Sequence, residues 1–320
     1  MKKSYKLVLK LAVSFVLLYY LMYKYELSVF YDSLVNLKGY WVIIALGCMM
    51  LSNLIGTFQW NLILKQLDIH LPLRRAAAFY FTGLFFNNFL LSFIGGDVVR
   101  YYDIRKTSGN KSAAISTVLF DRFVGTIILA SLALLGSLYM LYERDSSDTR
   151  IIFYGILTIF GILSFSLLFL FNKPFAKRFE PLGMFITPNR AHALLRDIYN
   201  SLHYFRDHKL FLGSLVLIGL LLQSARIFAH YSLARSVDVS ISVGYFFIFI
   251  PIITFMISLP ISFGGIGVRE WSASVLFKVA AVAGEDAAIF EGLAYIVAII
   301  CSLPGGIAFV FRKHEVKKKD

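Results

Sequence analysis

Two short segments decide how this chain folds: 260-PISFGGIGVRE-270 and 92-SFIGGDVVR-100. Each stands next to long apolar stretches and contains Ser-Phe, a glycine pair and a Val-Arg step. Ser92 and Ser262 are 170 positions apart, about half the length of the chain. Because glycine permits turns that other residues resist, each segment is a candidate break in a membrane-embedded helix.

The composition is that of a polytopic membrane protein. Of the 320 residues, 58% are hydrophobic and 16% are charged, and a soluble domain cannot cover that much apolar surface. The first apolar segment follows Lys2, Lys3 and Lys6 but lacks a small-residue cleavage site, so we expect a retained anchor. A helix needs roughly 20 apolar residues to cross a bilayer. Apolar segments that approach or exceed this length lie at 7–23, 40–63, 76–94, 113–141, 151–171, 210–233, 241–262 and 287–311.

The net charge of +13 is unevenly distributed between the loops. Most of the 32 Lys and Arg residues lie in the N-terminus, 64–75, 97–112, 172–209 and the C-terminal tail. This bias predicts that both termini are cytoplasmic, in a bacterial-type inner membrane. Basic juxtamembrane loops favour anionic lipid headgroups as partners, and we expect no nucleic acid.

Two apolar segments conflict with this charge pattern if each crosses the membrane completely. The loops on both sides of 76–94 are basic, and those on both sides of 241–262 are poor in Lys and Arg. The first segment contains Asn87-Asn88 and ends in Gly95-Gly96, and the second contains Pro251 and Pro260 and ends in Gly264-Gly265, so each has an internal reason to break. We therefore predict two re-entrant helical hairpins, whose irregular backbone must be covered by protein or line a cavity.

A shift of 170 residues aligns the two halves of the chain without gaps, and chance similarity between apolar segments is the alternative explanation. Segment 40–63 is predicted to run inward and 210–233 outward, so the halves would be inverted repeats. Inverted repeats with broken helices are typical of alternating-access transporters. The aligned polar pairs are Asp68 with Asp238, Asn53 with Gln223, Lys65 with Arg235, and Asp121 with Glu291.

The predicted fold class is therefore an all-α polytopic membrane protein with two inverted-topology halves, each containing a re-entrant hairpin. The linker between the halves is predicted to form an interfacial amphipathic helix, or else a small cytosolic helix packed on loops. It is too short for a catalytic domain. The predicted parts are an anchor helix at 1–39, the first half at 40–171, the linker at 172–209, the second half at 210–311 and a basic tail at 312–320.

Arg226 is the most informative single residue because it lies inside an apolar segment. An intramembrane arginine costs at least about 2.5–3.5 kcal/mol on insertion scales, so it faces a polar cavity or a partner. An ion pair with Glu291 or Asp121 is one interpretation, and contact with a lipid phosphate is the other. The residues predicted to line a polar cavity near it are Asn53, Gln223 and His230.

Each glycine segment also places an arginine beside a flexible turn, where backbone amides and a cation can hold an anion. Alternatively, the glycines only permit close helix packing, and Asp97 only caps a helix. Asp121-Arg122 is either a local pair or a gate that exchanges partners. We predict Arg100, Arg226 and Arg269 as lipid-phosphate ligands, and as hairpin or gate residues Gly95, Gly96, Asp97, Asp121, Arg122, Gly264, Gly265, Gly267, Glu270 and Glu291.

No catalytic, metal-binding or cofactor motif is recognisable. The GGIG segment is neither a dinucleotide fingerprint nor a phosphate loop, and the six histidines form no metal-ligand cluster. Cys48 and Cys301 lie in apolar segments and are predicted to be small buried hydrophobes. We expect no catalytic residue, no metal and no cofactor, although an intramembrane transferase that uses only Asp and Arg remains an alternative.

Four motifs together resemble the lysylphosphatidylglycerol synthase transmembrane family, a flippase-like group of integral membrane proteins. The resemblance covers about residues 7–311, although the first hairpin reads LLSFIGG where relatives often carry a proline before the glycines. The chain ends in 312-RKHEVKKKD-320 without a soluble aminoacyl-transferring domain, so we expect no synthase activity. The motifs are 87-NNFLLSFIGGDVVRYYDIRK-106, 115-ISTVLFDRFVG-125, 259-LPISFGGIGVRE-270 and 303-LPGG-306.

The resemblance implies that this chain translocates an anionic or phosphate-bearing lipid, of the aminoacyl-phosphatidylglycerol or polyprenyl-phosphate type. In that family, one membrane domain moves aminoacylated phosphatidylglycerol between leaflets, and relatives work beside glycosyltransferases that use polyprenyl-linked sugars. A lipid-modifying synthase or a glycosyltransferase is therefore an expected partner. The alternative function is that of a non-transporting accessory subunit. The lipid, the direction of transport, the energy source and the oligomeric state are not predicted.

Overall fold

The computed structural model describes residues 15–16, 19–20, 35–89, 95–143, 146–171, 203, 205–258, 262 and 264–317. Secondary structure within these residues is helical, which confirms the all-α prediction. The helices are α3 (Gly39–Gln66), α4 (Leu73–Phe89), α5 (Gly95–Ser108), α6 (Lys111–Glu143), α7 (Ser147–Phe171), α10 (Lys209–Ser236), α11 (Val243–Ser258), α12 (Val268–Leu276) and α13 (Gly284–Lys317), with 3-10 turns η1 (Phe205–Asp207) and η2 (Phe277–Ala280).

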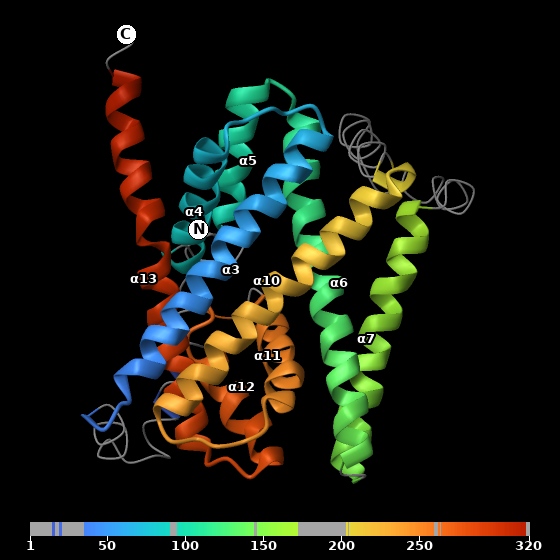
Figure 1. The fold of residues 1–320 in the computed structure, drawn as a ribbon, viewed down its shortest axis with the longest axis vertical. Helices are drawn as coiled ribbons and strands as arrows, with labels where there is room; N and C mark the ends of the chain where they lie inside the picture. Colours follow the sequence, from blue (N-terminus) through green and yellow to red (C-terminus); the bar gives the residue numbers. More distant parts are fainter. Residues whose placement is uncertain are drawn as a thin grey trace.

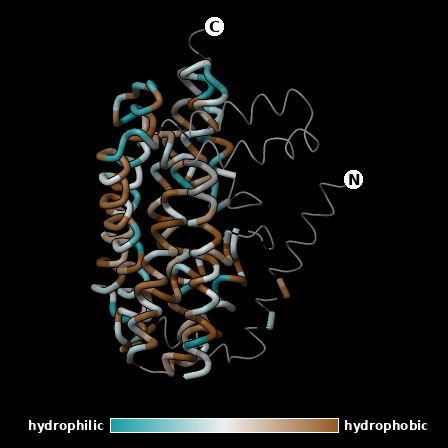
Figure 2. Tube along the Cα trace, turned by 90° about the vertical axis from the view of Figure 1, so that its right-hand side faces the viewer, coloured by the Kyte–Doolittle hydropathy of each residue, from teal (hydrophilic) through white to brown (hydrophobic). Residues whose placement is uncertain are grey.

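Four of these helices are long and apolar enough to cross a membrane: α3, α6, α10 and α13. They coincide with the predicted segments 40–63, 113–141, 210–233 and 287–311. Shorter apolar helices occur at Thr149–Phe165 and Val243–Ser258. Hydrophobic positions extend along the length of the helices (Figure 2). The chain is therefore a multi-pass membrane protein, while most of the predicted anchor 7–23 and of the linker 172–209 lies outside the described residues.

The two helices at the centre of the molecule are α3 and α10, which cross in opposite directions and share the most extensive helix contact (Figure 1). The pair α4 and α5 lies towards one end of the bundle, and the pair α11 and α12 lies towards the other. Helices α6 and α7 flank one side, and α13 lies on the opposite side, packed against α4. This arrangement places both halves of the chain around one central region.

The junctions that follow α3 and α10 have the same backbone structure. Asp68 and Asp238 both adopt left-handed conformations, with φ of 58° and 65°. The amide of Ile69 donates to Leu64 O at 2.9 Å, and that of Val239 donates to Ala234 O at 3.0 Å. Helices α3 and α10, each 28 residues long, begin at Gly39 and Lys209. The local structure thus recurs with the 170-residue offset of the sequence.

The expected helix break at Pro251 is wrong, because α11 continues through this buried proline to Ser258. Helix α4 contains both asparagines and ends directly after them, at Phe89. Pro260 lies outside the described residues. A proline removes one backbone donor, but surrounding protein can compensate within a membrane helix. The segments that follow, 90–94 and 259–261, lie outside the described residues.

Glycines bring α4 into backbone contact with two other helices. A Cβ atom on Gly96 of α5 would lie 1.8 Å from the carbonyl oxygen of Gly83 in α4. A Cβ atom on Gly305 of α13 would lie 1.9 Å from the carbonyl oxygen of Phe81. Small residues permit such close approach between membrane helices. Gly305, the first glycine of the LPGG motif, therefore has a packing role.

A candidate anion-binding cavity

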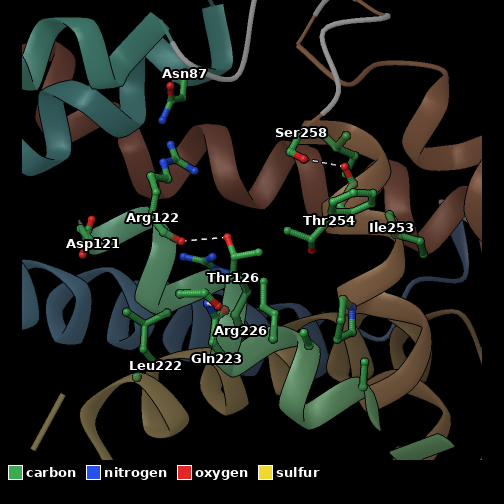
Figure 3. Close-up of a pocket in the computed structure, with 18 of the residues that line it drawn as sticks. Asn87, Asp121, Arg122, Thr126, Leu222, Gln223, Arg226, Ile253, Thr254 and Ser258 are labelled. Carbon is green, nitrogen blue, oxygen red and sulfur yellow. Dashed lines mark hydrogen bonds between the residues drawn. The ribbon is translucent and has the colours of Figure 1, made fainter. Parts of the chain in front are cut away.

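A cavity of about 320 Å³ lies where the two halves meet. Figure 3 shows Arg122 and Arg226 on neighbouring helices in this cavity, with Asn87 above them and Thr254 and Ser258 opposite. The lining combines polar groups with apolar walls, a combination that suits an amphiphilic ligand. Its polar residues are Asn53, Gln59, Tyr80, Asn87, Asn88, Arg100, Asp121, Arg122, Thr126, Gln223, Arg226, His230, Thr254, Ser258 and Arg269.

Arg100 of α5 is only 4% exposed, and its guanidinium group has several protein partners, although its Nε makes no hydrogen bond within the described residues. Its Nη2 donates to Asp121 Oδ2 at 2.8 Å. Its guanidinium carbon lies 4.2 Å from the Trp60 ring and 4.8 Å from the Tyr80 ring. Space for its stem comes from Gly83, where a Cβ atom would lie 2.7 Å from Arg100 Cδ. These contacts fix the Arg100 guanidinium in place.

The neighbours Asp121 and Arg122 each pair with a residue of α5. Arg122 Nε donates to Asp97 Oδ2 at 2.7 Å, and its Nη2 donates to Asp97 Oδ1 at 3.1 Å. Asp121 accepts from Arg100 and also from Gln59 Nε2, at 3.3 Å. Two carboxylates and two guanidinium groups thus form one network across α5 and α6. The interpretation of Asp121-Arg122 as a pair within one helix is wrong.

Arg226 and Arg269 lack such partners. Within the described residues, neither side chain makes an ion pair or a hydrogen bond, and the Arg269 guanidinium carbon lies 5.4 Å from the Tyr295 ring. The acids predicted as partners of Arg226 bond elsewhere, since Glu291 contacts His230 and Asp121 pairs with Arg100, although Asp121 still acts electrostatically on Arg226. The Glu270 carboxylate likewise interacts electrostatically with Arg269. The cavity therefore holds two guanidinium groups that form no direct ion pair with a described carboxylate.

The polar residues of α10 that were predicted to surround a cavity do line it. Gln223, Arg226 and His230 all contribute to its wall, and Asn53 of α3 joins them. Gln223 Nε2 donates to Gly125 O at 3.4 Å. His230 Nδ1 lies 2.5 Å from a carboxylate oxygen of Glu291, which is fully buried.

The glycine segments use their backbone amides internally. Gly96 N donates to Asn87 Oδ1 at 2.8 Å, and Gly267 N donates to Glu270 Oε2 at 2.8 Å. Glu270 thus caps the start of α12, and Gly264, Gly265 and Gly267 have φ of 60°, 82° and 83°. Asp97 lies within the first turn of α5, which begins at Gly95. Any anion in the cavity would accordingly meet side-chain guanidinium groups first.

Several lining residues were not predicted from the sequence. Gln59, Tyr80, Asn87 and Thr126 all contribute polar atoms to the cavity. Gln59 could have been found from the sequence, because an amide side chain inside a predicted membrane span needs a polar partner. The tyrosine and the threonine carry no such signal, since both are common in membrane helices.

The helices and the buried ion network define a multi-pass membrane protein with a polar cavity inside its helical bundle. The chain belongs to the family described as the lysylphosphatidylglycerol synthase TM region, whose model matches residues 7–307. This result confirms the family that the glycine motifs indicated. Among curated proteins, none matches the chain.

Proposed function

We propose that this protein moves an anionic or phosphate-bearing lipid between the two leaflets of a bacterial-type cytoplasmic membrane. The observation that supports it is the pair of guanidinium groups, Arg226 and Arg269, that line the cavity without a direct ion pair to any described residue. Unpaired cations at membrane depth are unfavourable unless a ligand or water compensates them. A guanidinium fork matches phosphate oxygens in geometry and charge.

The apolar wall of the cavity supports a lipid rather than a small soluble anion. Ile156 and Ile159 of α7 and Phe255 of α11 line the cavity together with the arginines. Ile159 is 37% exposed and Phe255 is 42% exposed, so this wall reaches the outer surface of the bundle. A headgroup at the arginines could therefore leave its acyl chains between α7 and α11, in contact with the bilayer.

The two-part architecture supports transport by alternating access. The starts of α3 and α4 recur 170 residues later as the starts of α10 and α11, and the pairs α4–α5 and α11–α12 lie at opposite ends of the bundle (Figure 1). In our proposal these pairs are re-entrant hairpins of two inverted repeats, and the cavity between them opens to each side in turn. Both termini are cytoplasmic in this proposal, as the positive-inside pattern favours.

The ion network is the proposed gate. The Arg122 side chain is 37% exposed while its partner Asp97 is 10% exposed, so this pair forms the accessible edge of the network. An entering phosphate can compete with Asp97 for Arg122. Release of Asp97 would loosen α5 from α6 and admit the headgroup.

Leaflet exchange in liposomes tests the proposal. Purified protein is reconstituted with labelled phosphatidylglycerol, its lysyl form or a short polyprenyl phosphate, as wild type and as Arg226→Gln. Arg235→Gln is the matched control, because Arg235 ends the same helix, bonds Ser240 and does not line the cavity. We expect selective exchange in the wild type and the control and its loss in Arg226→Gln.

Other outcomes would assign a different role. If folded wild-type protein exchanges none of these lipids, transport is refuted and the accessory role in a lipid-linked glycosyltransferase or envelope-lipid pathway takes its place. If the protein produces a modified lipid in detergent, where no leaflets exist, it is an intramembrane transferase.

A further inference from the structure

A histidine and a glutamate meet at the wall of the cavity. His230 of α10 lines the cavity, and Glu291 of α13 is fully buried beside it. The contact joins His230 Nδ1 to Glu291 Oε1 at 2.5 Å, and Glu291 Oε2 has no hydrogen-bond partner among the described residues. A buried carboxylate is unfavourable without compensation, so a pair of this kind needs a reason. The proposed function assigns no role to either residue.

The two ring nitrogens of His230 have different surroundings. An ionised carboxylate can only accept, so Nδ1 donates its hydrogen to Glu291 and Nε2 keeps a lone pair. Nε2 makes no hydrogen bond within the described part of the chain and, unlike Glu291 Oε2, is not fully enclosed. A proton from solvent in the cavity can therefore add to Nε2. The imidazolium that forms keeps its Nδ1 hydrogen on Glu291, whose negative charge favours it.

The neighbouring charges come from several helices. Arg226 lies one turn before the histidine on α10 and lines the same cavity. On α12, Glu270 interacts electrostatically with Glu291 and with Arg269, and Arg269 acts on Arg226 in turn. The ion network of α5 and α6 also acts on Arg226. Among the described residues, α3, α4 and α11 add no acidic or basic side chain to the cavity wall, and the titratable group that they add is Tyr80.

We propose that His230 is a proton-binding site whose occupancy is coupled to that of the anion site at Arg226 and Arg269. A proton on Nε2 adds positive charge one turn from Arg226, and like charges repel until an anion enters the cavity. By linkage, the anion binds more tightly when the histidine is protonated, and the proton binds more tightly when the anion is present. His230 and Glu291 thus form a proton site within the headgroup site.

This coupling supplies an energy source for the proposed transport. In an alternating-access cycle, the proton enters Nε2 with the headgroup on one side of the membrane and leaves the same atom on the other side. A proton gradient would then drive movement of the lipid. The inference rests on the proposed function for the lipid nature of the anion, but the linkage is measured by binding, without transport.

Calorimetry tests the linkage with a ligand that does not itself titrate. Full-length protein in detergent is titrated with dioctanoyl phosphatidylglycerol, whose phosphodiester stays ionised where histidine titrates. Titrations in buffers of different ionisation enthalpy give the number of protons taken up on binding. We expect an uptake of up to about one proton. The affinity should fall about fivefold or more between about pH 6 and pH 8, which is the lower end of usual couplings.

Two variants connect the proton to this pair. His230→Gln stays polar but takes up no proton in this pH range, so both the proton uptake and the pH dependence of affinity should disappear. Glu291→Gln removes the charge that favours the imidazolium, so both should move to lower pH. His208→Gln is the matched control, because His208 precedes the same helix and does not line the cavity. It should retain the wild-type profile.

Proton uptake that persists in His230→Gln would overturn the proposal, since the proton would then bind elsewhere. If His230→Gln does not fold, Glu291→Gln decides the question, and an unchanged pH profile in that variant would overturn the proposal. Dimethyl phosphate carries the same phosphodiester without acyl chains. If it binds as tightly as the lipid and with the same proton uptake, the linkage stands and belongs to a free anion.

The inference and the proposed function can fail separately. Binding of phosphatidylglycerol without proton uptake, together with leaflet exchange that does not change with pH, would overturn the inference and leave transport standing. Proton-linked binding without any leaflet exchange in liposomes would refute transport and leave the proton site standing.

Discussion

Charged residues at corresponding positions of the two halves have different partners. Asp121 on α6 and Glu291 on α13 are 170 residues apart and both are buried in ion pairs. Asp121 pairs with Arg100, which follows the first glycine pair on α5. Glu291 instead contacts His230 on α10. Arg269, which follows the second glycine segment, makes no direct ion pair among the described residues and interacts electrostatically with the adjacent Glu270.

This difference shows how a binding site can arise from a structural one. In the first half, the arginine is held by an acid, two aromatic rings and close helix packing, so its charge is already compensated. In the second half, the acid has a different partner, and the arginine forms no direct ion pair with a described residue. The same local design thus gives a directly bonded network on one side of the cavity, and on the other a cation whose hydrogen-bond donors are not used by an acid.

The largest effect is expected where the comparison predicts a structural network. Asp121→Ala leaves the buried Arg100 without its main partner, and breaking a buried ion pair costs about 3–5 kcal/mol. We expect a clear loss of thermal stability of the detergent-purified protein. The double variant Arg100→Met with Asp121→Leu should recover much of it. If Asp121→Ala melts at the wild-type temperature, the charge of Arg100 in the first half would be no better compensated than that of Arg269 in the second.

A second test examines the contact that fixes α4 between the halves. Gly305→Ala places a methyl group against the backbone of Phe81 in α4, so we expect a loss of about 1–3 kcal/mol, typical of overpacking. Gly292→Ala in the same helix is the matched control, because a Cβ atom there meets nothing within 4 Å. Thermal unfolding of both variants gives the comparison. Equal melting temperatures would contradict the close approach of α13 and α4.

A smaller effect is expected at the acid of the second half. Glu291→Gln keeps a hydrogen-bonding group beside His230 and removes the charge, so a charge-assisted hydrogen bond becomes a neutral one. The difference between these two kinds of bond is about 1 kcal/mol. The melting temperature should therefore fall less than in Asp121→Ala. A larger fall would show that Glu291, rather than Asp121, anchors the more important network.

Four membrane spans, and the place of Arg226 in the wall of an internal cavity, could be predicted from the sequence, because both depend on the energetic cost of placing a residue type in a bilayer. The partners of the charges could not. Asp121 and Arg122 are neighbours in sequence, yet both pair with α5, whose position is set by the contact of Gly83 with Gly96. Such a contact depends on the tertiary arrangement of helices far more than on local pattern.

The passage of α11 through Pro251 and the exact end of α4 could not be predicted for a similar reason. Proline and paired asparagines disfavour helices in water, where the backbone can form other hydrogen bonds. Asn87 uses its side chain to accept from Gly96, and Asn88 donates to Ser302 of α13 at 3.0 Å, so both are satisfied by packing. Once tertiary contacts satisfy these groups, α4 has no reason to end before Phe89.

The smallest change in stability is expected at Arg269, which makes it the sharpest test of the comparison. Arg269→Gln breaks no direct ion pair, although Glu270 loses the electrostatic effect of the arginine, and it removes a contact with the Tyr295 ring that is worth about 0.5–1 kcal/mol. The melting temperature should remain near that of the wild type, while lipid exchange in liposomes falls strongly. Arg269→Lys keeps the charge but loses the planar fork, so we expect an intermediate exchange rate. If Arg269→Gln instead destabilises the protein as much as Asp121→Ala does, Arg269 is a structural cation like Arg100, and the two halves are alike after all.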